Sequence, residues 1–175
     1  MVKYFLVLAG LLMALGSASA QVSPPETANG KIGNAMLAIK YCAPSVLGRQ
    51  IFGEGGRVMQ DPTAPIWRAG ANDATAFHTS ADLMIGGLAV PKGDYTLYVN
   101  VKDPDAWELV INKQTGQWGT SYDASQDLGR VKMQMSKPPA LIEVLKYTIS
   151  STGGNKGTIQ LAWEKHIASV PVTAK

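Results

Sequence analysis

The chain has 175 residues, of which 46% are apolar and 17% charged, a composition typical of one folded domain with a sizeable core. Its formal net charge of +3 is too small for the concentrated basic face of nucleic-acid-binding proteins, so we expect no nucleic-acid partner. The only cysteine, Cys42, excludes an intrachain disulfide, and we interpret it as a small buried apolar residue rather than a nucleophile.

Residues 1–20 have the pattern of a secretory signal peptide. Lys3 supplies a positive start, residues 4–15 are apolar, and Ala18-Ser19-Ala20 matches the small-residue cleavage pattern. We therefore predict an exported protein, periplasmic or extracellular, cleaved after Ala20. The apolar run is too short to span a membrane comfortably and no later segment is long enough, so we predict no transmembrane segment.

The next segments alternate between loops and a first strand. Residues 21–30 are polar with two prolines, and we expect a flexible tail. Residues 31–41 alternate, with Leu37, Ile39 and Tyr41 on one face, which predicts a strand that opens a domain over residues 31–175. Residues 43–53 are expected to form an ordered loop with apolar anchors, and residues 54–64 a mobile polar loop.

The rest of the chain is a series of short alternating runs separated by Gly, Pro, Asn and Asp turns, with no sustained helical period. About nine strands are expected, and two stacked sheets would cover the apolar face of each. We therefore predict an all-β fold, a single antiparallel β-sandwich with long ordered loops at one end. The later strands are expected at residues 75–78, 81–87, 95–101, 107–111, 131–135, 141–149, 159–163 and 170–172.

Residues 66–75 contain the densest group of polar side chains that need partners. Arg68 carries five N–H donors and a permanent charge beside the apolar Trp67, so it requires acceptors. Gly70 and Asn72 both tolerate a left-handed backbone. We favour a structural clamp, in which Arg68 and Asn72 tie one loop to its neighbours. An anion-binding or catalytic corner is the alternative.

The sequence does not match the motifs of common enzymes and metal sites that we compared with it. Residues 123–128 begin like a calcium loop but lack its glycine and final glutamate, and residues 153–158 lack the order of a phosphate loop. Two histidines cannot supply three zinc ligands without carboxylates. We predict no metal, no cofactor and no catalytic residue. His78 should be exposed, opposite Phe77, and His166 should also lie at the surface.

Three groups of residues carry a resemblance to a known family: Gly48-Arg49-x-Ile51-Phe52-Gly53, Trp67-Arg68-x-Gly70-Ala71-Asn72, and Asn112-Lys113-Gln114-Thr115-Gly116-Gln117-Trp118-Gly119. Over residues 33–172 the chain resembles a bacterial family of exported proteins catalogued as domain of unknown function 2911. That family tends to carry glutamate where this chain has Asp73. The resemblance implies an exported β protein and no established activity.

The hypothesis for a site is that Arg49, Trp67, Arg68 and Asn72 converge at the loop end of the sandwich, with Tyr41 and Thr75 beside them. Arginine pairs with carboxylates in a bidentate way and aromatic rings stack on apolar faces, so an anionic or sugar-like ligand, or a component of the cell envelope, would fit.

That site predicts a non-enzymatic binding or interaction module. One alternative is a hydrolase of envelope saccharide or peptide that uses Asp73 or Glu164 with His78. A second is a purely structural domain.

Overall fold

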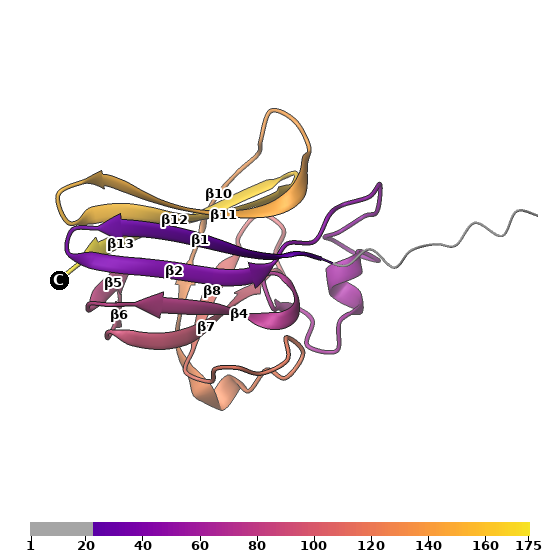
Figure 1. Ribbon diagram of the computed structural model, residues 1–175. Coiled ribbons are helices and arrows are strands. Elements are labelled where there is room, and N and C mark those ends of the chain that lie inside the picture. The colour runs from indigo at the N-terminus through magenta and orange to yellow at the C-terminus, as the bar shows by residue number, and fades with distance from the viewer. Residues whose placement is uncertain (1–22) are drawn as a thin grey trace, which may run out of the picture.

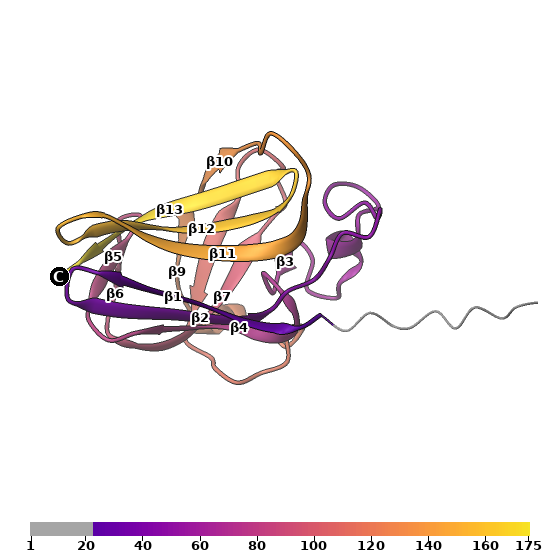
Figure 2. The same ribbon diagram turned by 45° about the horizontal axis from the view of Figure 1, so that its top comes forward.

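The computed structural model describes residues 23–175, so the predicted signal peptide and its cleavage site lie outside the described residues. Thirteen strands form two antiparallel sheets that face each other, as the turned view shows (Figure 2). The predicted all-β sandwich is confirmed, with more strands than the nine expected. In the part of the chain that the structure describes, no helix is long and apolar enough to cross a membrane.

The first sheet has the strand order β1-β2-β4-β7-β8-β9, with β3 paired to β7. Its strands are β1 (Pro25–Ile32), β2 (Ala35–Cys42), β3 (Ile66–Trp67), β4 (Ala71–Thr79), β7 (Gly93–Asn100), β8 (Glu108–Asn112) and β9 (Asp127–Lys132). The second sheet has the order β11-β12-β13-β5-β6, with β10 paired to β13. Its strands are β5 (Leu83–Ile85), β6 (Leu88–Val90), β10 (Gln134–Ser136), β11 (Ile142–Gly153), β12 (Lys156–Glu164) and β13 (His166–Ala174).

The N-terminal hairpin corrects two predictions. Residues 25–30, expected in a flexible tail, belong to β1, which pairs with β2 along its whole length. The predicted strand over residues 31–41 is interrupted by Gly33 and Asn34, the two-residue turn between Ile32 and Ala35. Gly33 has φ +57°, which a two-residue hairpin turn requires. The sequence did not predict β1 because most of its side chains are exposed and show no alternation of apolar and polar residues. This strand is held by backbone pairing with β2.

The predicted strand at residues 131–135 is also two strands. β9 ends at Lys132 in the first sheet and β10 begins at Gln134 in the second, so the chain crosses between the sheets at Met133. Met133 is buried and donates its backbone N–H to the Trp107 carbonyl at 2.9 Å. Sequence alternation continues through the crossing because the core side of both sheets is the same apolar interior.

The core lies between the sheets and follows the predicted faces. Leu37 and Ile39 of β2 are buried, as are Leu109 and Ile111 of β8. Phe77 is 1% exposed, whereas the His78 side chain beside it is 50% exposed, as predicted. His166 corrects its prediction, because its side chain is only 21% exposed, with its ring stacked on Trp107.

Two long connections position the candidate site. Residues 43–65 project from the end of the sandwich opposite the C-terminus (Figure 1). Ile51 and Phe52 anchor this connection in the core, as predicted. Its second half, expected to be mobile, contains the 3-10 helix η1 (Arg57–Gln60), in which Val58 is buried. The other connection, residues 113–126, covers β7 and β8 on the outer face of the first sheet and includes η2 (Ala124–Gln126).

Candidate functional site

The backbone of residues 69–70 is held by buried side chains. Trp67 Nε1 donates to the Gly70 carbonyl at 3.1 Å. Thr75 Oγ1 and the Tyr147 hydroxyl donate to the Ala69 carbonyl at 3.1 and 3.0 Å. Burial raises the pKa of the Tyr147 phenol, so this donor keeps its proton. The bonds fix Ala69 in a left-handed conformation, with φ +52°, and hold the start of β4 against β11 in the opposite sheet.

Arg68 ties three segments together. Its Nη2 forms a salt bridge with Asp61 Oδ2 at 2.7 Å, and its Nη1 donates to the Asn72 carbonyl at 3.2 Å. The same carbonyl accepts the Gly119 N–H at 3.0 Å. Gly119 must be glycine, because a Cβ there would lie 2.6 Å from the Asn72 carbonyl oxygen and collide with the Arg68 side chain. The favoured clamp interpretation therefore describes the geometry of Arg68.

A cavity of about 250 Å³ lies beside this clamp, and we call it the arginine pocket. Three guanidinium groups line it, from Arg49, Arg57 and Arg68, against one carboxylate, that of Asp61. Two stacked indoles, Trp67 and Trp163, form its apolar part, with ring centroids 5.6 Å apart and planes 20° apart. The pocket thus combines an excess of positive charge with a wall backed by two indoles that are 2% and 3% exposed.

Two of the three arginines retain unused donors. Arg49 donates Nε to the Val46 carbonyl at 3.0 Å and Nη2 to the Ser45 carbonyl at 2.6 Å. In the part of the chain that the structure describes, the Arg57 guanidinium donates only to the Gln60 side chain, from Nη1 to Oε1 at 3.2 Å. Neither has a carboxylate partner within the described residues. Since a guanidinium has five N–H donors, both arginines can bind an anionic ligand and keep their present hydrogen bonds.

The structure brings together four of the six residues predicted for a binding site. Arg49, Trp67, Arg68 and Asn72 all line the arginine pocket. Tyr41 and Thr75 do not line it: Thr75 is fully buried behind it, and Tyr41 is 8% exposed with its ring packed on Tyr147.

Sequence reasoning missed Arg57, Asp61 and Trp163, which also line the arginine pocket. The lone arginine in the glycine-rich loop was the available signal for the first of these. For Trp163, the alternation along the strand predicted burial in the core and gave no sign of a pocket.

The secondary candidates do not form one site. Asp73 and His78 lie on β4, and His78 Nδ1 contacts Asp94 Oδ1 at 2.8 Å. Glu164 lies in the opposite sheet and contacts His166, with Nδ1 to Oε2 at 3.0 Å but without the angle of a hydrogen bond. Within residues 23–175, no three His, Cys, Asp or Glu side chains are placed to hold a metal. The structure therefore does not bring Glu164 to His78.

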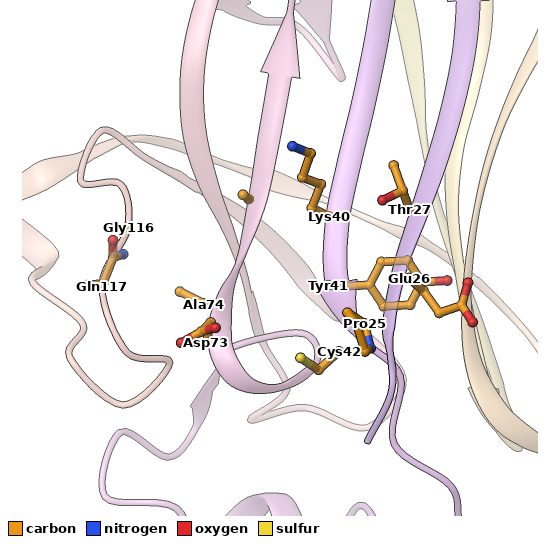
Figure 3. Close-up of a pocket in the computed structure, with 11 residues that line it drawn as sticks. Pro25, Glu26, Thr27, Lys40, Tyr41, Cys42, Asp73, Ala74, Gly116 and Gln117 are labelled. Atoms are coloured by element: carbon orange, nitrogen blue, oxygen red, sulfur yellow. The ribbon is translucent and has the colours of Figure 1, made fainter. Parts of the chain in front are cut away.

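Cys42 corrects its predicted burial. It is half-buried at the end of β2 and lines a second cavity of about 390 Å³ on the outer face of the first sheet. Figure 3 shows its sulfur pointing from β2 toward β4, on the same side as the Lys40 ammonium. The prediction failed because side chains alternate along β2. Tyr41 faces the core, so Cys42 faces outward, as Lys40 does.

The family described as "Protein of unknown function (DUF2911)" matches residues 23–172, which cover both sheets, the clamp and the arginine pocket. The chain belongs to this family. No curated protein and no solved structure matches it. The DUF2911 match begins at residue 23, just before β1, so residues 25–30 of that strand, which were expected in a tail, are part of the family's domain.

Proposed function

We propose that this DUF2911 protein is an exported binding module that holds a small anion, a carboxylate or phosphate, in the arginine pocket without turning it over. The observation that carries the proposal is the convergence of three guanidinium groups on one cavity with a single carboxylate. Arginine is suited to this task, because its planar fork binds two oxygens of a carboxylate or phosphate at once.

The three arginines have different roles in the proposed site. Arg68 is neutralised by Asp61 and fixes the pocket wall. Arg57, on η1, and Arg49 carry charge that no carboxylate of residues 23–175 neutralises. Trp67 and Trp163 are 2% and 3% exposed, so they give a ligand almost no surface and serve to hold the pocket wall. An anionic ligand would form charge-assisted hydrogen bonds with these guanidinium groups. No protein hydrogen bond would have to break, because the N–H donors concerned have no acceptor among the described residues.

A binding role is also supported by what surrounds the pocket. None of the hydrolase candidates Asp73, Glu164 and His78 lines the pocket, and Glu164 lies in the opposite sheet from the other two. Cys42 lines a different cavity. The charged groups that line the pocket are three permanent cations, which bind and orient a ligand but do not shuttle protons at neutral pH, and the Asp61 carboxylate, which is salt-bridged to Arg68.

The test is calorimetric titration of the protein with inorganic phosphate, pyrophosphate and citrate. We expect saturable binding that is weakened in Arg57→Ala and retained in Lys92→Ala, an exposed residue that changes the net charge equally. Equal weakening in both variants would mean nonspecific attraction and would overturn the proposal. So would the absence of binding by all three anions at millimolar concentration.

A further inference from the structure

A groove crosses the outer face of the first sheet and shares no lining residue with the arginine pocket, although Asn72 of the pocket and Asp73 of the groove are consecutive. Two cavities form it, one of about 390 Å³ over β1, β2 and β4 and one of about 490 Å³ over β2, β4 and β7. They adjoin each other at Lys40 and Ala76, which line both. Each has the volume of a ligand pocket, for which about 300 to 1,000 Å³ is usual.

The floor of the groove is made of alanines. Ala38 lies on β2, and Ala74 and Ala76 lie on β4, all facing outward. In the strand register Ala76 sits between Lys40 of β2 and Thr96 of β7, so a small side chain separates two taller ones. This arrangement leaves a trough across the strands, while the backbone hydrogen bonds of the sheet beneath it are already made.

The 113–126 connection forms one wall and is held rigidly. Thr96 Oγ1 donates its single proton to the Gln114 carbonyl at 2.7 Å, so it can only accept from Gln117 Nε2, at 3.3 Å. Gln117 Nε2 also donates to the Tyr98 hydroxyl at 3.0 Å. The amide orientation is thereby fixed, and Gln117 Oε1 is left as a buried acceptor without a partner in the described residues. This atom is shielded from solvent, so the Gln117 network holds the wall in place and does not itself contact a ligand.

Figure 3 shows the wall and the strands facing each other. Gln117 lies on the side of the connection, Lys40 and Cys42 on the side of β2, and Asp73 between them. The groove is lined by the carboxylates of Glu26, Asp73 and Asp94 and by one ammonium, that of Lys40. Acceptors therefore outnumber cations, which favours a ligand rich in hydroxyl donors and opposes a polyanion.

An exposed indole stands at the same end of the groove as Asp73. Trp118 is 53% exposed and forms an isolated antiparallel bridge with Asp73. Residues directly opposite in such a bridge project to the same side of the pair. The neighbours of Trp118 are fixed by backbone bonds, from Ala74 N to the Gln117 carbonyl at 3.2 Å and from Gly119 N to the Asn72 carbonyl at 3.0 Å. Trp118 lines neither cavity, but Asp73 does, so a large apolar ring on a fixed backbone stands at the rim of the groove as a stacking surface.

We propose that this groove binds a neutral oligosaccharide, with one sugar ring stacked on Trp118 at the rim and hydroxyls of the sugar chain bonded to Asp73 and Lys40. A pyranose has a flat C–H face for the indole and hydroxyl groups that both donate and accept. A peptide strand fits less well, because strand addition needs a free sheet edge and the groove lies over a sheet face. The proposal is independent of the anion site, since the two cavities share no lining residue.

Trp118 provides the readout, because the other three tryptophans are at most 3% exposed. Acrylamide quenching of the emission should therefore report on Trp118. We expect cellohexaose, chitohexaose, xylohexaose or mannohexaose to protect it from quenching in a saturable way. Trp118→Ala and Ala76→Arg, which fills the trough, should each weaken calorimetric binding by about tenfold or more, the loss of one stacking contact.

Leu141→Ala is the matched control, since Leu141 is 50% exposed just before β11 in the other sheet and should bind as the parent does. Arg57→Ala should also bind these sugars normally, which separates this site from the anion site. Absence of protection by all four sugars would overturn the proposal, and so would protection by a gelatin peptide digest alone. Unchanged affinity in a folded Trp118→Ala variant would overturn it as well, even if Ala76→Arg does not fold.

Discussion

Arg68 and Asp61 form a salt bridge of 2.7 Å between Nη2 and Oδ2, with side chains 11% and 24% exposed. Asp61 lies directly after η1, and Arg68 lies between β3 and β4, so the pair fastens the projecting connection to the first sheet. This contact fixes η1, and with it Arg57, at the mouth of the arginine pocket. The residue that the sequence marked most strongly is therefore structural in the first place, and it positions the groups that remain free to bind.

Loss of this salt bridge should lower the free energy of unfolding. Arg68→Ala leaves Asp61 shielded without a partner and removes the bond to the Asn72 carbonyl, and a loss of about 2 to 4 kcal/mol is expected. Urea unfolding followed by tryptophan emission measures it. Arg57→Ala, which breaks only an exposed bond to Gln60, should change the value by no more than about 0.5 kcal/mol. Equal losses in both variants would contradict this division.

Asn72 should tolerate glycine better than alanine. Its φ of +60° is left-handed, and the bonds of its segment use its backbone carbonyl. Asn72→Gly should therefore keep the stability of the parent, whereas Asn72→Ala should lose about 1 kcal/mol from backbone strain. Thermal unfolding compares them. Because Asn72→Gly also removes a carboxamide from the arginine pocket, its phosphate affinity reports on that group alone. An Asn72→Ala variant as stable as Asn72→Gly would refute the role of the backbone.

The side-chain alternation predicted the two-sheet fold, because a strand with one buried face has an apolar residue at every second position. It placed Leu37, Ile39 and Phe77 in the core correctly. It failed for β1, whose residues are mostly exposed and whose stability comes from backbone pairing with β2. It failed also at Met133, where the strand changes sheet without any break in the apolar pattern.

The candidate site was predictable in part. Arg49, Trp67, Arg68 and Asn72 stood out because each is polar or aromatic beside a turn residue, and all four line the pocket. The partner of Arg68 could not be predicted, since Asp61 lies in a polar loop where any carboxylate looks solvated. Which charges are neutralised is decided by three-dimensional contacts between separate loops, and spacing along the chain does not contain that information.

Alkaline pH should unfold the protein. Burial raises the pKa of all five tyrosines in the described part of the chain above the usual 10.0, and that of Tyr122 to about 12, where the hydrogen bond to Asp127 also raises it. The folded state keeps protons that the unfolded state releases above pH 10. Stability is therefore full below pH 10 and falls as the pH rises from 10 through 12.

Phenolate absorbance, followed together with circular dichroism across this range, measures the effect. We expect phenolate to appear only as the strand signal is lost. Tyr147→Phe removes the most deeply buried of these phenols and should make the decline of stability with pH shallower. Phenolate that appears with a midpoint near the usual 10.0 in a fully folded protein would refute the prediction.

Phe52 should control both the core and the arginine pocket. Its ring packs against Trp67, Trp107 and Trp163, with centroid distances of 5.4, 4.6 and 5.7 Å, and anchors the connection between Arg49 and Arg57. Phe52→Ala should cost about 3 kcal/mol or more through the cavity it leaves. Phosphate affinity, measured by calorimetry where the variant is folded, should fall as well, because the two arginines lose their common anchor.

The matched control for this prediction is Phe77→Ala. Phe77 is 1% exposed on β4 and does not line the arginine pocket, so its loss should cost similar stability and leave phosphate affinity unchanged. A pocket that depends on the local anchor will separate the two variants, whereas one that depends only on global stability will lose affinity in both. The comparison therefore tests whether the 43–53 loop, and not the sandwich as a whole, sets the geometry of the anion site.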